Sequence, residues 1–182
     1  MTAHKPPPAE GPQRRVGVDP GPVHGGLVVL VHRGGVLQGV EVPLGSRPLM
    51  GEIRRWLAGR RGDQVAIEWV TGGRIASAAV LETAVEVGRV IETVLRAGGT
   101  VHALSRPRVA SILGARGDAH TRRRLIDLWS RLPGHTPEGD RLTTGPGSVP
   151  EALRKVARDG WSALAVAHAS LEARDKIFRS GS

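Results

Sequence analysis

Apolar residues alternate with small or polar ones near the start of the chain, a pattern typical of a β-strand. Residues 15–21 show this alternation, and residues 25–32 and 36–44 are largely apolar runs joined by short glycine-rich links. Three such segments in succession predict an antiparallel meander. Two further strands are expected at residues 64–70 and 100–104.

Helical spacing of apolar residues takes over later in the chain. The longest helix is expected at residues 74–97, where Gly98 and Gly99 supply the stop. Further helices are expected at residues 48–60, 107–114, 120–132 and 151–174, with a Gly-, Pro- and Thr-rich loop at 133–150. A meander, then alternating helices and strands, then helices predicts the α/β class, with a mixed five-stranded sheet flanked by α-helices.

The length of 182 residues indicates one domain with a substantial core. We place this domain at residues 15–175. Residues 1–14 contain three consecutive prolines and are expected to form a disordered basic arm, and residues 176–182 a flexible tail. No apolar run approaches the roughly 20 residues that span a bilayer, so no membrane partner is expected.

Charge and cysteine content narrow the choice of function. The net charge is +9, which favours a polyanionic partner such as nucleic acid, although a membrane surface or incidental basicity would also accommodate it. The chain has no cysteine, which excludes disulfides, zinc–thiolate sites and thiol nucleophiles. Any metal would therefore have oxygen or imidazole ligands, which suits Mg²⁺ or Mn²⁺.

Three carboxylates occupy positions that suit metal-dependent chemistry. Asp19 ends the first strand, Glu68 ends a later strand, and Asp159 opens an alanine-rich helical segment. By strand alternation Asp19 shares a face with Gly17 and Glu68 with Ala66, and we expect these small neighbours to leave room for a metal and a phosphate. Two metal ions held by such acids would promote cleavage of a phosphodiester.

Each carboxylate also has an ordinary structural interpretation. Asp19 precedes Pro20 and Gly21 and is suited to a turn. In the ordinary interpretation Glu68 pairs with an arginine at the sheet edge, and Asp159 is the N-cap of its helix. The order and spacing of the three acids favour the metal site over coincidence.

The chain resembles RuvC-type Holliday junction resolvases of the RNase H-like superfamily over residues 15–169. The segments that carry the resemblance are Gly17 to Gly21 with Gly25-Gly26, Ala66-Ile67-Glu68, Gly114 to Arg124, and Asp159 to His168. The resemblance implies an RNase H-like fold and a metal-dependent endonuclease that resolves four-way junction DNA by paired symmetric nicks. It also implies a homodimer acting in the cytoplasm of a bacterium or a phage-infected cell. The helix at 74–97, which carries small residues along one stripe, is the candidate dimer interface.

The same resemblance assigns roles to individual residues. Asp19 is expected to bridge two Mg²⁺ (or Mn²⁺) ions, while Glu68 and Asp159 hold one each. Ser162 stands where relatives carry a second acid on the last helix, and we expect it to support a metal-bound water. The expected DNA-binding residues are His120, Arg122, Arg123, Arg124 and Arg74. The loop after Glu68, where relatives place an aromatic residue, has none here, and Trp69 should point to the opposite face of its strand.

Rival functions remain open on sequence alone. An RNase H-fold enzyme that cuts other branched DNA, single strands or RNA–DNA hybrids would show the same residues. Ser162 in place of an acid would also fit a catalytically weakened module that binds junctions. An actin-like or sugar-kinase ATPase shares the strand-Asp-x-Gly turn but normally needs two such domains, and this chain has room for one.

Overall fold

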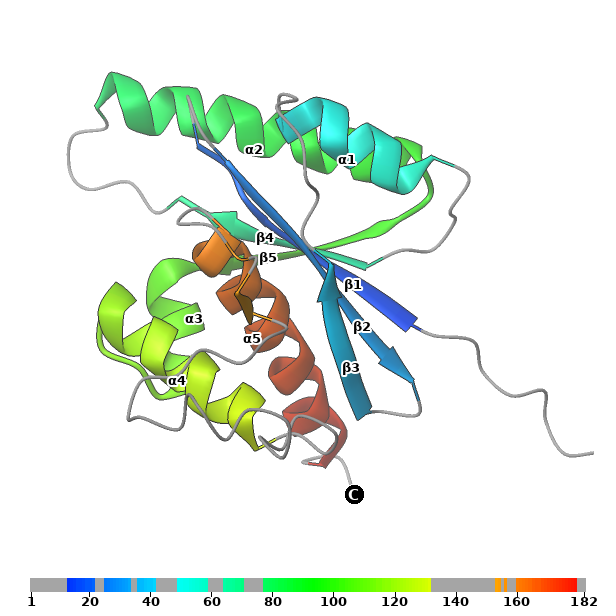
Figure 1. The fold of residues 1–182 in the computed structure, drawn as a ribbon. Coiled ribbons are helices and arrows are strands. Elements are labelled where there is room, and N and C mark those ends of the chain that lie inside the picture. The colour runs from blue at the N-terminus through cyan, green and yellow to red at the C-terminus, as the bar shows by residue number, and fades with distance from the viewer. Residues whose placement is uncertain are drawn as a thin grey trace, which may run out of the picture.

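Five strands form one mixed sheet with helices on both of its faces (Figure 1). The computed structural model describes residues 13–21, 25–33, 36–41, 49–58, 64–70, 77–131, 153–154, 156 and 160–179. The strands are β1 (Gln13–Asp19), β2 (Gly26–Arg33), β3 (Val36–Glu41), β4 (Gln64–Trp69) and β5 (Thr100–Ser105). The helices are α1 (Leu49–Leu57), α2 (Ala78–Arg96), α3 (Arg106–Leu113), α4 (Asp118–Ser130) and α5 (Gly160–Arg179). The expected α/β class, with a mixed sheet flanked by helices, is confirmed.

The spatial order of the strands is β3-β2-β1-β4-β5. β2 pairs antiparallel with both β1 and β3, which is the meander expected from the first three apolar segments. β4 pairs in parallel with β1 on one side and with β5 on the other. The carboxyl ends of β1, β4 and β5 therefore lie at the same edge of the sheet.

The strand alternation divides the core into two layers. Val16 and Val18 of β1, with Val65 and Ile67 of β4, pack beneath α1 and α2. Ala66, between the last two, faces the opposite layer of α3, α4 and α5. Figure 1 shows the two helical layers on either side of the sheet. The alternation read from the sequence thus predicted the correct face for these residues.

Element bounds differ modestly from expectation. β1 begins at Gln13, two residues before the expected domain start, and α5 runs to Arg179, past the expected domain end at 175. α2 begins at Ala78 because the side chain of Ser77 accepts a hydrogen bond from the backbone N–H of Val80. Residues 1–12 of the expected arm, the loop at 133–150 and residues 180–182 of the expected tail lie outside the described residues. Within the described part of the chain, no helix is long and apolar enough to cross a membrane.

Candidate functional site

Asp19 and Glu68 end two adjacent parallel strands. The sequence predicted that each acid ends a strand, and the structure shows that the two strands are neighbours. Val18 of β1 is paired in register with Ile67 of β4, so the acid that follows each of them reaches the same sheet edge. Both acids line one cleft of about 920 Å³. The Glu68 side chain is only 13% exposed, whereas Trp69 beside it is 48% exposed and does not line the cleft.

The cleft lies between the sheet edge and the layer formed by α3, α4 and α5. Its charged lining residues within the described part of the chain are Asp19, Glu68, Asp118, Arg106 and Arg122. These are three carboxylates and two guanidinium groups, so the described lining carries one net negative charge.

α5 covers β1 at unusually short range because Gly17 has no side chain. A Cβ at Gly17 would lie 2.0 Å from the carbonyl oxygen of Ala163 and 2.7 Å from the Cβ of Ala167. Nearer the start of β1, the buried Arg15 donates a hydrogen bond to Oγ of Ser170 at 2.9 Å. These contacts fix α5 along β1, and they bring its first turn to the edge of the cleft.

This packing corrects one expectation about the small residues. Gly17 was expected to leave room for a metal and a phosphate, but the space above it is filled by the backbone of α5. Ala66 is fully buried in the same core layer as Ala163. The small side chains serve the close approach of α5, and the open space lies further along the strands, beyond Asp19 and Glu68.

The first turn of α5 supplies an aromatic wall to the cleft. Trp161 and Ser162 both line it and are partly buried. The guanidinium carbon of Arg122, on α4, lies 4.7 Å from the centre of the Trp161 ring, within the range of a cation–π contact. Arg122 is therefore held at the cleft with its positive charge exposed.

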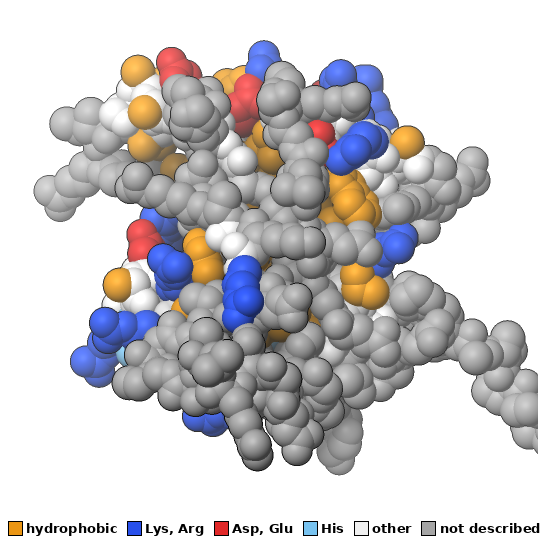
Figure 2. All heavy atoms as spheres, viewed as in Figure 1, with side chains coloured by type: hydrophobic (Ala, Val, Ile, Leu, Met, Phe, Trp, Pro, Cys, Tyr) orange, Lys and Arg blue, Asp and Glu red, His pale blue; other side chains and the backbone are white. Residues whose placement is uncertain are grey.

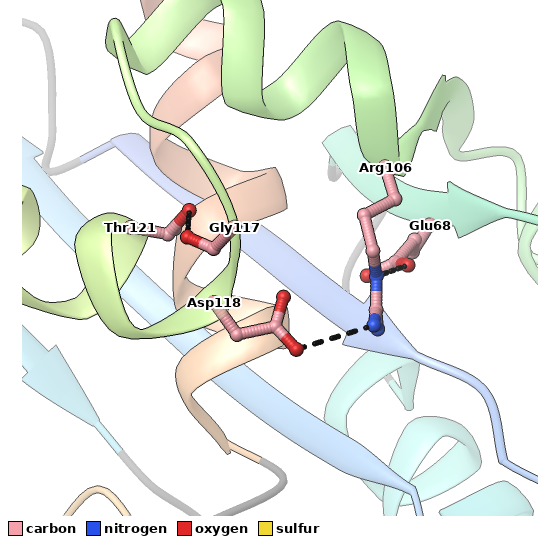
Figure 3. Close-up of polar contacts among 5 residues, drawn as sticks. All are labelled: Glu68, Arg106, Gly117, Asp118 and Thr121. Atoms are coloured by element: carbon pink, nitrogen blue, oxygen red, sulfur yellow. Dashed lines mark hydrogen bonds and ion pairs between the residues drawn. The ribbon is translucent and has the colours of Figure 1, made fainter.

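Arg106 connects the acids of the cleft. Its Nε donates a hydrogen bond to Oε1 of Glu68 at 2.6 Å, and its Nη1 lies 3.5 Å from Oδ2 of Asp118 (Figure 3). The pKa of Arg106 is raised, first by its hydrogen bond with Glu68, against an opposing effect of partial burial. The negative charges of Glu68, Asp118 and Asp19 raise it further. The pairing of Glu68 with an arginine, one of the two interpretations of this acid, is thus present.

Sequence reasoning missed Arg106 and Asp118 as parts of the site. Arg106 directly follows β5, whose residue Leu104 is paired in register with Glu68. Asp118 follows Gly117, whose φ of 81° turns the chain into α4. The available signal was the position of Arg106 at the carboxyl end of a strand, because parallel strands end at one edge of the sheet. Its use required knowing that β5 lies beside β4.

The other predicted site residues are distributed as follows. His120, Arg123 and Arg124 lie on α4 but are not among the residues that line the cleft. Nδ1 of His120 accepts a hydrogen bond from the backbone N–H of Arg116 at 3.0 Å. Asp159 and Arg74 lie outside the described residues, so their roles stay predictions.

The acids among the described residues of the cleft offer the oxygen ligands that a hard divalent cation prefers. Mg²⁺ prefers oxygen ligands and is commonly held by one or two carboxylates together with substrate phosphates. Asp19 and Glu68 supply such a pair, and the guanidinium of Arg106 already bonded to Glu68 shows that this position attracts positive charge. Among the described residues no group of three or more acidic, histidine or cysteine side chains is arranged to hold a metal ion. A fuller ligand set would need Asp159 or groups of the substrate.

Comparison with known proteins gives a fold but no sequence relative. No protein-family model matches the chain, and no curated protein has a significantly similar sequence. Among solved structures, the chain matches Thermus thermophilus RuvC in complex with a Holliday junction substrate, with a TM-score of 0.58 and 20% identity. That match covers 90% of this chain and 96% of the other. The chain has the RuvC fold.

A second solved structure agrees. Another structure of Thermus thermophilus RuvC matches with a TM-score of 0.54 and 22% identity. This match covers 90% of the present chain and 97% of the RuvC chain. The RuvC fold therefore extends over nearly the whole chain and leaves no room for a second large domain in the matched part. The predicted resemblance is confirmed at the level of fold.

Proposed function

We propose that this chain is a metal-dependent, structure-selective DNA endonuclease that resolves four-way junctions by symmetric paired nicks. The observation that carries the proposal is the pair of carboxylates, Asp19 and Glu68, at the ends of adjacent strands in one cleft of a RuvC fold. The net charge of +9 supports a DNA partner. In the view of Figure 2, basic side chains predominate over acidic ones in the lower half, where α3 and α4 lie.

The charges of the cleft support metal dependence. The described lining carries one net negative charge, which favours a bound cation beside Asp19 and Glu68. In the proposed enzyme Asp19 and Glu68 hold Mg²⁺ or Mn²⁺, and Asp159 and Ser162 complete the ligand set or orient its waters. A bound divalent cation would supply an activated water and stabilise the charge that develops on the leaving oxygen.

The chain's own residues position the DNA. Arg122, stacked on Trp161, presents a fixed cation to a phosphate near the scissile bond. Ser162 faces the same space from the first turn of α5. His120, Arg123, Arg124 and Arg74 are proposed to contact the DNA backbone further from the cleft, where contacts add affinity without base specificity.

A symmetric dimer is part of the proposal, because two opposed strands of a junction need two active sites. α2 buries Val87, Val90 and Val94 against the sheet and yet exposes apolar residues on its outer side. Leu81 and Leu95 are each 58% exposed on that outer side. Figure 2 shows hydrophobic side chains at the surface around the N-terminal end of α2. A second copy of the chain, placed helix against helix, would bury this stripe.

The first experiment is cleavage of a synthetic four-way junction, with each strand labelled in turn, in Mg²⁺ and then in Mn²⁺. Paired symmetric nicks, lost in Asp19→Asn and Glu68→Gln, are the expected result. Asp127→Asn is the matched control, since Asp127 is an exposed acid of α4 outside the cleft lining. A linear duplex of the same sequence should remain intact. Cutting of forks, single strands or RNA–DNA hybrids in preference to junctions would point to another nuclease of the same fold.

A junction-binding module without catalysis is the second candidate, and Ser162 is the observation that favours it. A hydroxyl in the cleft is a weaker cation ligand than a carboxylate. Tight junction binding without cleavage, with cutting gained in Ser162→Asp, would support this second function. The proposed setting of either function is DNA recombination and repair in the cytoplasm of a bacterium or a phage-infected cell.

A further inference from the structure

Arg106 lies among the carboxylates of the cleft. Its guanidinium is hydrogen-bonded to Glu68 and ion-paired with Asp118 (Figure 3). The charge of Asp19 also contributes to raising the pKa of Arg106. The two acids proposed to hold the metal therefore already act on a cation that belongs to the protein.

The Glu68–Arg106 pair is well formed but not enclosed. The Arg106 side chain is 54% exposed and that of Asp118 is 80% exposed, while the Glu68 carboxylate is 13% exposed. Ion pairs with such exposure are weak, because water and salt screen them and both partners keep alternatives. Arg106 is thus free to exchange partners without unfolding α3.

An incoming phosphate would offer Arg106 a matching partner. A guanidinium binds phosphate through two parallel N–H···O bonds, a geometry that a single carboxylate bond at Nε does not use fully. Arg122, the other cation of the described lining, stacks on the ring of Trp161, so its contact with a phosphate would not release Glu68. Arg106 is the cation whose transfer would uncover a carboxylate.

We propose that Arg106 is an exchangeable counter-ion that occupies Glu68 in the DNA-free protein and moves to a DNA phosphate when a divalent cation binds Glu68. This inference rests on the proposed function and concerns the regulation of the same site. Arg106 then suppresses metal binding in the absence of DNA, and by linkage metal and DNA each raise the affinity for the other. The enzyme would acquire its metal on its substrate and would remain largely metal-free elsewhere.

Mn²⁺ binding without DNA, followed by the electron paramagnetic resonance signal of the free ion, tests the proposal. Arg106→Gln should raise the Mn²⁺ affinity on the order of tenfold, within the usual range of coupling between two sites. Arg122→Gln removes the same charge from the same cleft without touching Glu68, and its Mn²⁺ affinity should stay within about twofold of wild type. Arg106→Lys keeps the charge and loses the fork, so it should fall between wild type and Arg106→Gln.

A second measurement tests the exchange itself. Junction affinity is measured with EDTA and with Ca²⁺, and the ratio of the two should be large for wild type and clearly smaller for Arg106→Gln. Thermal melts of each variant establish that it is folded, which the exposure of Arg106 favours.

Three results would overturn the proposal. Unchanged or weaker Mn²⁺ binding by Arg106→Gln would mean that Arg106 positions Glu68. An equal rise in Arg122→Gln would mean that only the general field of the cleft matters. If the ratio of junction affinities in Ca²⁺ and in EDTA were the same in Arg106→Gln as in wild type, Arg106 would not exchange between Glu68 and a phosphate. Failure of the proposed function looks different: wild type would bind Mn²⁺ through Asp19, and Arg106→Gln would raise that affinity, yet no junction would be bound or cut.

Discussion

Replacement of Gly17 by alanine should separate α5 from the sheet and so test how the cleft is built. The added Cβ would lie 2.0 Å from the carbonyl oxygen of Ala163, where ordinary contact begins at about 3.4 Å. A backbone oxygen in the middle of a helix has no rotamer to adopt, so helix and strand must move apart by roughly 1 Å or more. Such overpacking typically costs 1–3 kcal/mol, and the backbone contact places this case at about 3 kcal/mol.

The same displacement should reduce activity, because Trp161 and Ser162 belong to the first turn of α5. A misplacement of about 1 Å can lower the rate of a positioned reaction on the order of 100-fold. We therefore expect Gly17→Ala to unfold at a clearly lower urea concentration and to cut a junction about 100 times more slowly at a temperature where it remains folded.

Gly88→Ala is the matched control for the unfolding measurement. A Cβ at Gly88, on the exposed side of α2, meets no atom within 4 Å. Alanine in a helix interior is more favourable than glycine by roughly 0.5–1 kcal/mol, so this variant should be more stable in dilute, monomeric protein. The reasoning would be refuted if the free energy of unfolding of Gly17→Ala lay within about 1 kcal/mol of that of wild type, since α5 would then not contact β1 as the structure shows.

Three further predictions concern the α2 surface, the largely buried His168 of α5 and the aromatic wall. Leu81→Glu with Leu95→Glu should convert a dimer to monomer in analytical ultracentrifugation, and a wild-type monomer at micromolar concentration would contradict the proposed interface. Burial lowers the pKa of His168 to about 4, so the folded state binds fewer protons than the unfolded state between pH 6.5 and 4. The free energy of unfolding measured in urea should fall by up to about 3 kcal/mol as the pH falls through that window, and the fall should be smaller in His168→Leu. Arg122→Ala should weaken junction binding several-fold and lower its salt slope by about one, and Trp161→Ala should cause part of the same loss.

The sequence predicted those parts of the fold that local patterns determine. Alternation along β1 and β4 placed Val18 and Ile67 on the faces opposite to the acids that follow them, and both valine and isoleucine lie in the core layer beneath α1 and α2. The stop after α3 was also visible, because Gly114 adopts a φ of 63°, a conformation that glycine accepts readily. These features depend on neighbours in the chain and on the period of a strand or helix.

The missed features depend on contacts between distant segments. Arg106 meets Glu68 across 38 positions of sequence, and only because β5 is placed next to β4. Trp161 reads as one more apolar residue of a helix until α4 brings Arg122 onto its ring. Gly17 reads as a small residue beside an acid until α5 occupies its space. Each of these required the strand order and the helix placement, which no local pattern contains.

The charge of the cleft separates the two proposed functions more sharply than cleavage alone. In EDTA, Asp19→Asn removes a negative charge and should improve junction binding whichever function is correct, because the described lining then becomes neutral. With Ca²⁺ present, the two functions diverge. A metal-dependent nuclease should lose in Asp19→Asn the binding that the cation supports, whereas a module that binds through arginines alone should keep the gain seen in EDTA. A protein that only binds junctions gains nothing from two carboxylates at the strand ends in its DNA cleft, since each repels a phosphate. The pair of carboxylates at adjacent strand ends, with Arg106 hydrogen-bonded to Glu68, therefore supports a bound cation and the proposed catalysis.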